Sequence, residues 1–170
     1  GETAVAAYGV MMYAGFIFVA IYIGYSMGSA PIVSYHYGAK NSSELKNMYK
    51  KGLSLMIVGG IILVALAEIF VRPIVAIFVS YELELLEVTI HGCRITLLSF
   101  LFAGINIWGS GFFTSLNNGL ISAIISFLRT LVFQVVTILV FPAFFGLNGI
   151  WYAMVSADIL SCLVTVIFLL

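Results

Sequence analysis

The chain has 170 residues, of which 63% are hydrophobic and 8% are charged, and its formal net charge at pH 7 is zero. A soluble domain of this length needs more charge to cover its surface, so a mean hydropathy of +1.19 indicates that the chain is embedded in lipid. Zero net charge argues against a nucleic-acid partner, because neutralising phosphates requires a basic patch.

Five stretches are apolar over the roughly 20 residues that a membrane-spanning helix requires. In chain order, they predict helices over about residues 4–30, 53–71, 88–113, 120–141 and 147–170. The predicted fold class is therefore all-α, a polytopic bundle of transmembrane helices. Because the chain begins with Gly1 rather than Met and ends inside an apolar stretch, we expect a fragment of a larger membrane protein.

Proline, asparagine and glycine predict where these helices end. Pro31 lacks an N–H group, so the first helix should end or kink just before it, and Pro73 should end the second helix in the same way. Residues 74–79 are then too short to span a membrane, and we expect them to lie at the interface. Turn residues at 117–119 and 142–149 separate the last three helices.

Basic residues predict the orientation of the chain. Four lysines lie between the first and second predicted helices, whereas the loops on the opposite side of the membrane carry only one basic residue, Arg72. The positive-inside tendency therefore places residues 31–52 in the cytoplasm as a loop. The four lysines of this loop are Lys40, Lys46, Lys50 and Lys51.

Two ionisable residues lie deep in the predicted membrane segments. Arg129 is about 12 residues from the outer end of the fourth helix, roughly 18 Å deep, and Asp158 is about 11 residues into the fifth, roughly 16 Å deep. Because a short loop joins these helices, we expect the two side chains to interact directly or through water. They form either a structural ion pair or a pair that faces a central cavity, where substrate or a coupling ion competes for the carboxylate.

A second polar layer is expected nearer the outside. Glu87, His91 and Arg94 are spaced by four and three residues, so they share one face of the third helix, and Glu68 lies at a similar depth on the second. A cluster of these groups would titrate near neutral pH and would suit proton coupling. The alternative is a set of side chains that snorkel to the interface.

Other polar residues admit two interpretations each. Asn106 and Gln134 either donate hydrogen bonds to a ligand or bridge helices. Pro31, Tyr35 and His36 form either an ordinary helix exit with aromatic residues at the headgroup level or a gate.

No residue pattern predicts enzymatic chemistry. The sequence has no Walker A motif, no Ser/His/Asp arrangement and no metal-ligand spacing, so we expect no catalytic and no metal site. Cys93 and Cys162 lie in apolar runs and are expected to be buried thiols rather than a disulfide.

Four segments resemble the multidrug and toxic compound extrusion (MATE) transporters. GSAPIVSYHYGA (28–39) resembles the segment that closes the second helix of each half in that family, and TAVAAYGV (3–10) resembles the entry to the eighth family helix. FFTSLNNG (112–119) is similar to the turn after the tenth helix, and LNGIWYAMVSAD (147–158) to the start of the twelfth. The resemblance implies a partial carboxy-terminal lobe of a twelve-helix transporter, without its own first helix and without the amino-terminal lobe.

The resemblance also implies a function. MATE-like proteins export organic, often cationic, compounds from the cell across the plasma (inner) membrane by antiport with protons or sodium through alternating access. The implied partners are small organic substrates, the lipid bilayer and the missing amino-terminal lobe, and no cofactor is implied beyond the coupling ion. Some members carry a mid-membrane carboxylate on the tenth helix. Here the corresponding span has no carboxylate deeper than Glu87, so no sodium site is assigned.

Two alternatives remain open at this stage. A lipid-linked oligosaccharide flippase of the same superfamily would carry several cationic residues in its cavity, whereas this chain offers only Arg129 deep in the membrane. A non-transporting membrane scaffold subunit would not need the buried charges of Arg129 and Asp158.

Overall fold

The structure is a computed structural model that describes residues 2–79 and 82–170, and these residues are helical apart from short connections. This confirms the predicted all-α class. The helices are α1 (Glu2–Gly38), α2 (Ser42–Val79), α3 (Leu83–Leu97), α4 (Phe100–Ser115), α5 (Gly119–Phe127), the π-helical segment η1 (Leu128–Phe133), α6 (Gln134–Phe145) and α7 (Leu147–Leu169).

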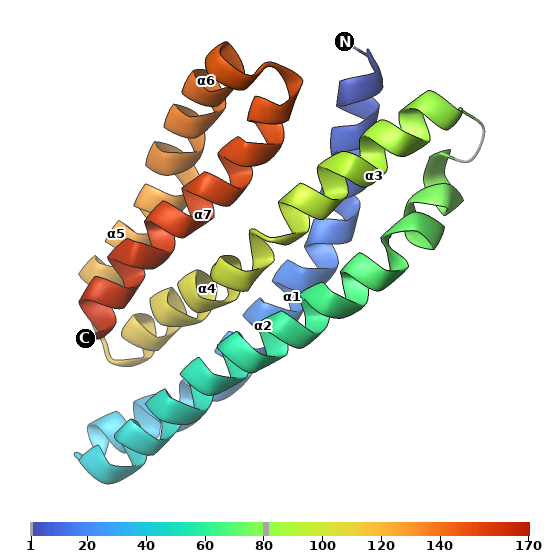
Figure 1. Ribbon diagram of the computed structural model, residues 1–170. Helices are drawn as coiled ribbons and strands as arrows, with labels where there is room; N and C mark the ends of the chain where they lie inside the picture. Colours follow the sequence, from blue (N-terminus) through green and yellow to red (C-terminus); the bar gives the residue numbers. More distant parts are fainter. Residues whose placement is uncertain (1, 80–81) are drawn as a thin grey trace.

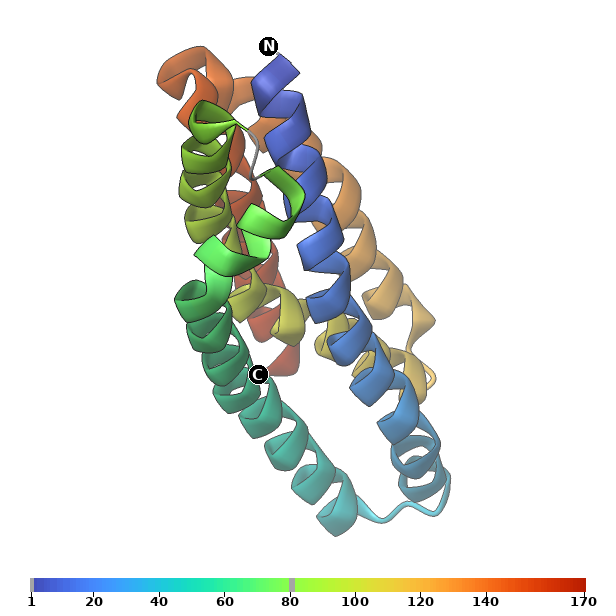
Figure 2. The ribbon, with the colours of Figure 1, turned by 90° about the vertical axis from the view of Figure 1, so that its right-hand side faces the viewer.

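The helices pack as a bundle with α3 and α4 at its centre. These two helices contact α1 and α2 on one side and α7 on the other, and α6 packs against α7 (Figure 1). The hairpin of α1 and α2 extends well beyond the chain's carboxy-terminus at its lower end (Figures 1 and 2). The long hairpin and the shorter α5–α7 unit therefore lie on opposite sides of α3 and α4.

Most of the expected spans are present. Four helices are long and apolar enough to cross a membrane: Val5–Gly38, Ser42–Val79, Gly119–Phe145 and Leu147–Leu169.

The third expected span, 88–113, is not one straight helix. α3 and α4 together meet the criteria for a span but are bent by 45°. At the bend, the N–H of Leu98 bonds to the carbonyl of Ile95 and the N–H of Ser99 to that of Thr96. These shortened hydrogen bonds tighten the helix for one turn and change its direction without proline or glycine.

The first expected boundary was placed too early. α1 continues through Pro31 to Gly38, and α2 begins at Ser42, so residues 31–52 are not a loop but two helix ends joined by a short turn. Tertiary contacts hold the last turns of α1, since Val33 is only 2% exposed and Ser34 donates a hydrogen bond to the carbonyl of Ser115. These contacts offset the one backbone hydrogen bond that Pro31 removes.

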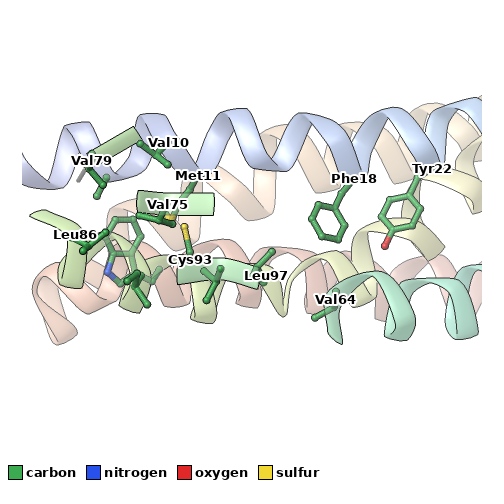
Figure 3. Close-up of a cluster of buried hydrophobic side chains, with 14 of the residues drawn as sticks. Val10, Met11, Phe18, Tyr22, Val64, Val75, Val79, Leu86, Cys93 and Leu97 are labelled. Carbon is green, nitrogen blue, oxygen red and sulfur yellow. The ribbon is translucent and has the colours of Figure 1, made fainter. Parts of the chain in front are cut away.

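The second expected boundary was also wrong. α2 passes through Pro73, and residues 74–79 continue the helix instead of lying at the interface. The physical reason is burial: Val71, Val75 and Val79, spaced by four residues, form one buried face. Figure 3 shows Val75 and Val79 in the same cluster as Leu86 of α3.

Small residues let the helices approach closely around large aromatic side chains. A Cβ atom on Gly104 of α4 would lie 2.9 Å from the ring of Tyr22, and one on Gly92 of α3 would lie 2.8 Å from the indole of Trp151. The hydroxyl of Tyr22 donates to the carbonyl of Phe100 at 2.9 Å. These contacts fix α1 and α7 against α3 and α4.

The two cysteines fit their expected role. Cys93 and Cys162 are both free and buried. Cys93 lies among apolar side chains in Figure 3, where it packs as a small hydrophobic residue.

Candidate functional site

Arg129 and Asp158 form a direct ion pair. The Nε–H of Arg129 donates to Oδ1 of Asp158 at 2.9 Å, and the side chains are 25% and 16% exposed, respectively. The contact confirms that the two residues meet across the α5–α7 hairpin at matching depth.

Arg129 lies in the π-helical segment η1. The segment covers Leu128–Phe133, interrupts the otherwise α-helical span between Gly119 and Phe145, and contacts α7. A π-helical turn contains an extra residue relative to an α-helical one, so it rotates the side chains that follow. Such segments occur frequently at functional sites, and here the segment contains Arg129, whose side chain is 25% exposed.

Asn106 of α4 holds the backbone at Asp158 through a hydrogen bond. Its Nδ2 donates to the backbone carbonyl of Asp158 at 3.1 Å, and its Oδ1 accepts from Thr165 Oγ1 at 2.9 Å. Asn106 is 1% exposed and Thr165 is fully buried. Of its two expected roles, Asn106 therefore makes the contacts of a helix bridge between α4 and α7.

A cavity of about 390 Å³ opens beside the ion pair. Its polar wall includes Arg129, Gln134 and Asp158, while Met and Phe side chains of α1 line the opposite side. Thr96 and Ser99, on either side of the bend between α3 and α4, also line it. The hydroxyl of Thr96 is buried and has no hydrogen-bond partner within the described residues.

This cavity can accommodate an organic group and present three kinds of contact to it. The carboxylate attracts a cation, the hydroxyl and amide groups offer hydrogen bonds, and the apolar wall offers contact area. Sequence analysis missed Thr96 and Ser99. The available signal was their spacing of three residues, which puts both hydroxyls on one helix face at about the expected depth of Asp158.

The expected outer layer is divided among separate contacts rather than forming one cluster. Both ion pairs join α2 to α3 through exposed or half-buried side chains, whereas His91 joins α3 to α7. The contacts are Arg72–Glu87 at 3.0 Å, Arg94–Glu68 at 3.9 Å and His91 Nε2–Asn148 Oδ1 at 3.1 Å. The helical continuation of α2 through Pro73 brings Arg72 to Glu87, a partner that the predicted helix end did not provide.

The residues proposed as a gate do not line the cavity. Pro31 lies within α1, and Tyr35 is 71% exposed. The ring of His36 meets that of Tyr35 edge-on with centroids 5.3 Å apart, and its Nδ1 is buried without a partner among the described residues. A gating role for these residues remains a prediction.

The sequence and the fold were compared with those of known proteins. The MatE family model matches residues 1–140. No curated protein matches the sequence.

Two solved structures of transporters from that family have the same fold. An outward-facing "multidrug resistance MATE family transporter of the MOP superfamily" superposes with a TM-score of 0.91 at 20% identity, covering 99% of this chain and 38% of that one. The Vibrio cholerae MATE transporter VcmN in its bent form gives a TM-score of 0.90 at 18% identity, with 98% and 38% coverage. The chain thus spans well under half the length of these proteins, and the likeness establishes the fold.

Proposed function

The chain belongs to the MatE family, and on that premise we propose that it forms one wall of a multidrug efflux transporter. In this proposal, the complete protein exports organic, often cationic, compounds by antiport with protons or sodium ions through alternating access. The chain supplies part of the carboxy-terminal lobe, and an amino-terminal lobe of the same polypeptide supplies the facing wall. The protein crosses the plasma (inner) membrane with its lysine-rich turn in the cytoplasm.

The position of the Arg129–Asp158 pair on the cavity wall carries this proposal. The hydrogen bond from Arg129 occupies Oδ1 of Asp158. A cationic substrate group or a coupling ion that binds the carboxylate must compete with the guanidinium. If substrate and coupling ion both bind this carboxylate, each displaces the other, which is the mutually exclusive binding that antiport requires.

The two alternatives have less support. A flippase for a pyrophosphate-linked lipid calls for several cations in its cavity, whereas Arg129 is the one cationic side chain that lines the cavity in the described part of the chain. A scaffold subunit has no need of an ion pair inside the membrane. An apolar pair of similar size would hold the helices together without the free-energy cost of placing two charges in lipid.

The test uses the complete gene in bacteria that lack their own efflux pumps. Retention of a fluorescent cationic dye is followed with and without a proton or sodium gradient, for the wild type, Asp158→Asn and a control, Glu84→Gln. The control removes an exposed carboxylate at the start of α3 that does not line the cavity.

Gradient-dependent loss of dye that Asp158→Asn weakens, at equal expression and with the control unchanged, is the expected result. Dye retention that does not differ between cells with and without the wild-type protein would contradict multidrug efflux. It would favour a narrower substrate such as a lipid-linked oligosaccharide.

A further inference from the structure

Four lysines gather at the α1–α2 end of the molecule without carboxylate partners. None of them forms an ion pair in the part of the chain that the structure describes. The one nearby carboxylate, Glu44, instead accepts a hydrogen bond from Asn47 at 3.2 Å. The lysines are Lys40, Lys46, Lys50 and Lys51.

The length of α2 places two of these lysines at the edge of the bilayer. From Lys51 to Arg72 the helix rises about 31 Å at 1.5 Å per residue, which matches the roughly 30 Å thickness of the hydrocarbon core. Arg72 pairs with Glu87 at the opposite end, where both side chains are largely exposed. Lys50 and Lys51 therefore lie at the level of the lipid headgroups, with apolar helix directly beyond them.

A shallow, largely open groove of about 540 Å³ lies beside these lysines on α2 and is bordered by Tyr25 of α1. On α2, Ser54 follows Lys50 by four residues and Val58 follows Ser54 by four, so the lining residues share one helix face. Along this face, ammonium groups come first, then a hydroxyl, then branched alkyl side chains. The α2 residues that line the groove are Lys50, Lys51, Ser54, Leu55 and Val58.

We propose that this groove is a binding site for an anionic phospholipid. Lys50 and Lys51 bind the phosphate, Ser54 and the hydroxyl of Tyr25 face the ester-linked glycerol region, and one acyl chain lies along Leu55 and Val58. The order of the lining matches the order of groups in a phospholipid from headgroup to tail. Leu55 and Val58 are 48% and 52% exposed, so an acyl chain covers apolar surface that the bundle leaves open.

Charge decides the class of lipid. Unpaired lysines at a membrane surface attract anionic headgroups. A phosphatidylcholine headgroup carries its own ammonium group beside the phosphate, and that charge opposes the two lysines. This site is independent of the Arg129–Asp158 cavity and of the transported substrate, and it requires that the chain crosses a membrane and that the rest of the complete protein leaves this face of α2 open to lipid.

The test measures lipid binding to the complete purified protein by native mass spectrometry, titrated with dioleoylphosphatidylglycerol or dioleoylphosphatidylcholine. The variant Lys50→Gln/Lys51→Gln is compared with Lys40→Gln/Lys46→Gln. The control removes the same charge from lysines that do not line the groove. A soluble headgroup without acyl chains, glycerophosphoglycerol, serves as a competitor.

We expect wild-type protein to prefer phosphatidylglycerol, the groove variant to bind it about thirtyfold more weakly, and the control to change binding less than about threefold. Equal loss in both variants would show diffuse attraction to the lysine-rich end and would overturn the site. Equal binding of phosphatidylcholine would also overturn it, because headgroup charge would then play no role. Full competition by glycerophosphoglycerol at equal concentration would overturn it too, because the acyl chain would then play no role.

Discussion

Replacing Arg129 with methionine separates the structural contribution of the ion pair from its contribution to transport. The change removes one charge-assisted hydrogen bond to Asp158, and such bonds contribute about 1.5–3 kcal/mol. Leaving a fully buried charge without its partner costs about 3–5 kcal/mol. Asp158, however, is 16% exposed and borders a cavity of about 390 Å³, which has room for several water molecules. We therefore expect Arg129→Met to lower the free energy of unfolding by about 2 kcal/mol, near the lower estimate.

A double-mutant cycle tests this reasoning. The variants are Arg129→Met, Asp158→Asn and the combination, unfolded by titration with sodium dodecyl sulfate from mixed micelles of the complete protein. In the combined variant neither charge is left alone, so it should be less destabilised than the sum of the single variants by about 1–2 kcal/mol. Additive effects, with a coupling below about 0.5 kcal/mol, would refute the idea that the pair stabilises the hairpin.

Transport assays on the same proteins complete the comparison. If the pair serves only to hold the helices together, dye export should follow the amount of folded protein. If it lies on the transport pathway, Arg129→Met should remain folded and export dye more slowly per folded molecule. Failure to recover any folded Arg129→Met protein would favour the purely structural role.

Three further single variants and one double variant probe contacts between helices. Asn106→Leu leaves the carbonyl of Asp158 without its donor from α4, so thermal unfolding should show a loss of about 1–3 kcal/mol, whereas an unchanged midpoint would mean that water replaces the bond. Gly104→Ala places a methyl group 2.9 Å from the ring of Tyr22 and should cost about 1–3 kcal/mol in the same measurement. A smaller side chain at position 22 should relieve this crowding, so Tyr22→Leu in the Gly104→Ala background should recover part of the lost stability. A purely additive result would contradict a steric cause. Glu87→Gln breaks an exposed pair with Arg72 and should change stability by less than about 1 kcal/mol, and a larger loss would show that the pair is not freely solvated.

The contact between Arg129 and Asp158 was predictable from the sequence because both the depth of a residue in a span and the antiparallel packing of a short hairpin follow from local features. Hydropathy locates the spans, and the rise per residue converts position into depth. This reasoning does not include how α7 is rotated against α4. It therefore did not identify the contact of Asn106 with the carbonyl of Asp158, which depends on the rotation of two helices that are distant in sequence.

The helix ends and the bend were not predictable from local rules. Proline weakens a helix at one hydrogen bond, but burial of Val33 beyond Pro31 and of Val75 and Val79 beyond Pro73 outweighs that cost. The change in direction after Leu97 occurs where the sequence has neither proline nor glycine. Tertiary packing determines both outcomes, and a single sequence does not encode that packing in a pattern that can be read locally.

The projection of the α1–α2 hairpin has a consequence for experiments on intact membranes. α1 and α2 contain 37 and 38 residues, and each is therefore about 56 Å long, far more than the bilayer core. With Lys51 and Arg72 at the two edges of the core, part of the surplus projects from the membrane and ends in an exposed turn at Lys40, whose positive φ of 54° marks a sharp reversal of the chain. Trypsin cleaves after lysine, so protease added to sealed vesicles of known sidedness will cut here from one side only. The hairpin tip is thus a built-in reporter of topology that requires no added tag or label.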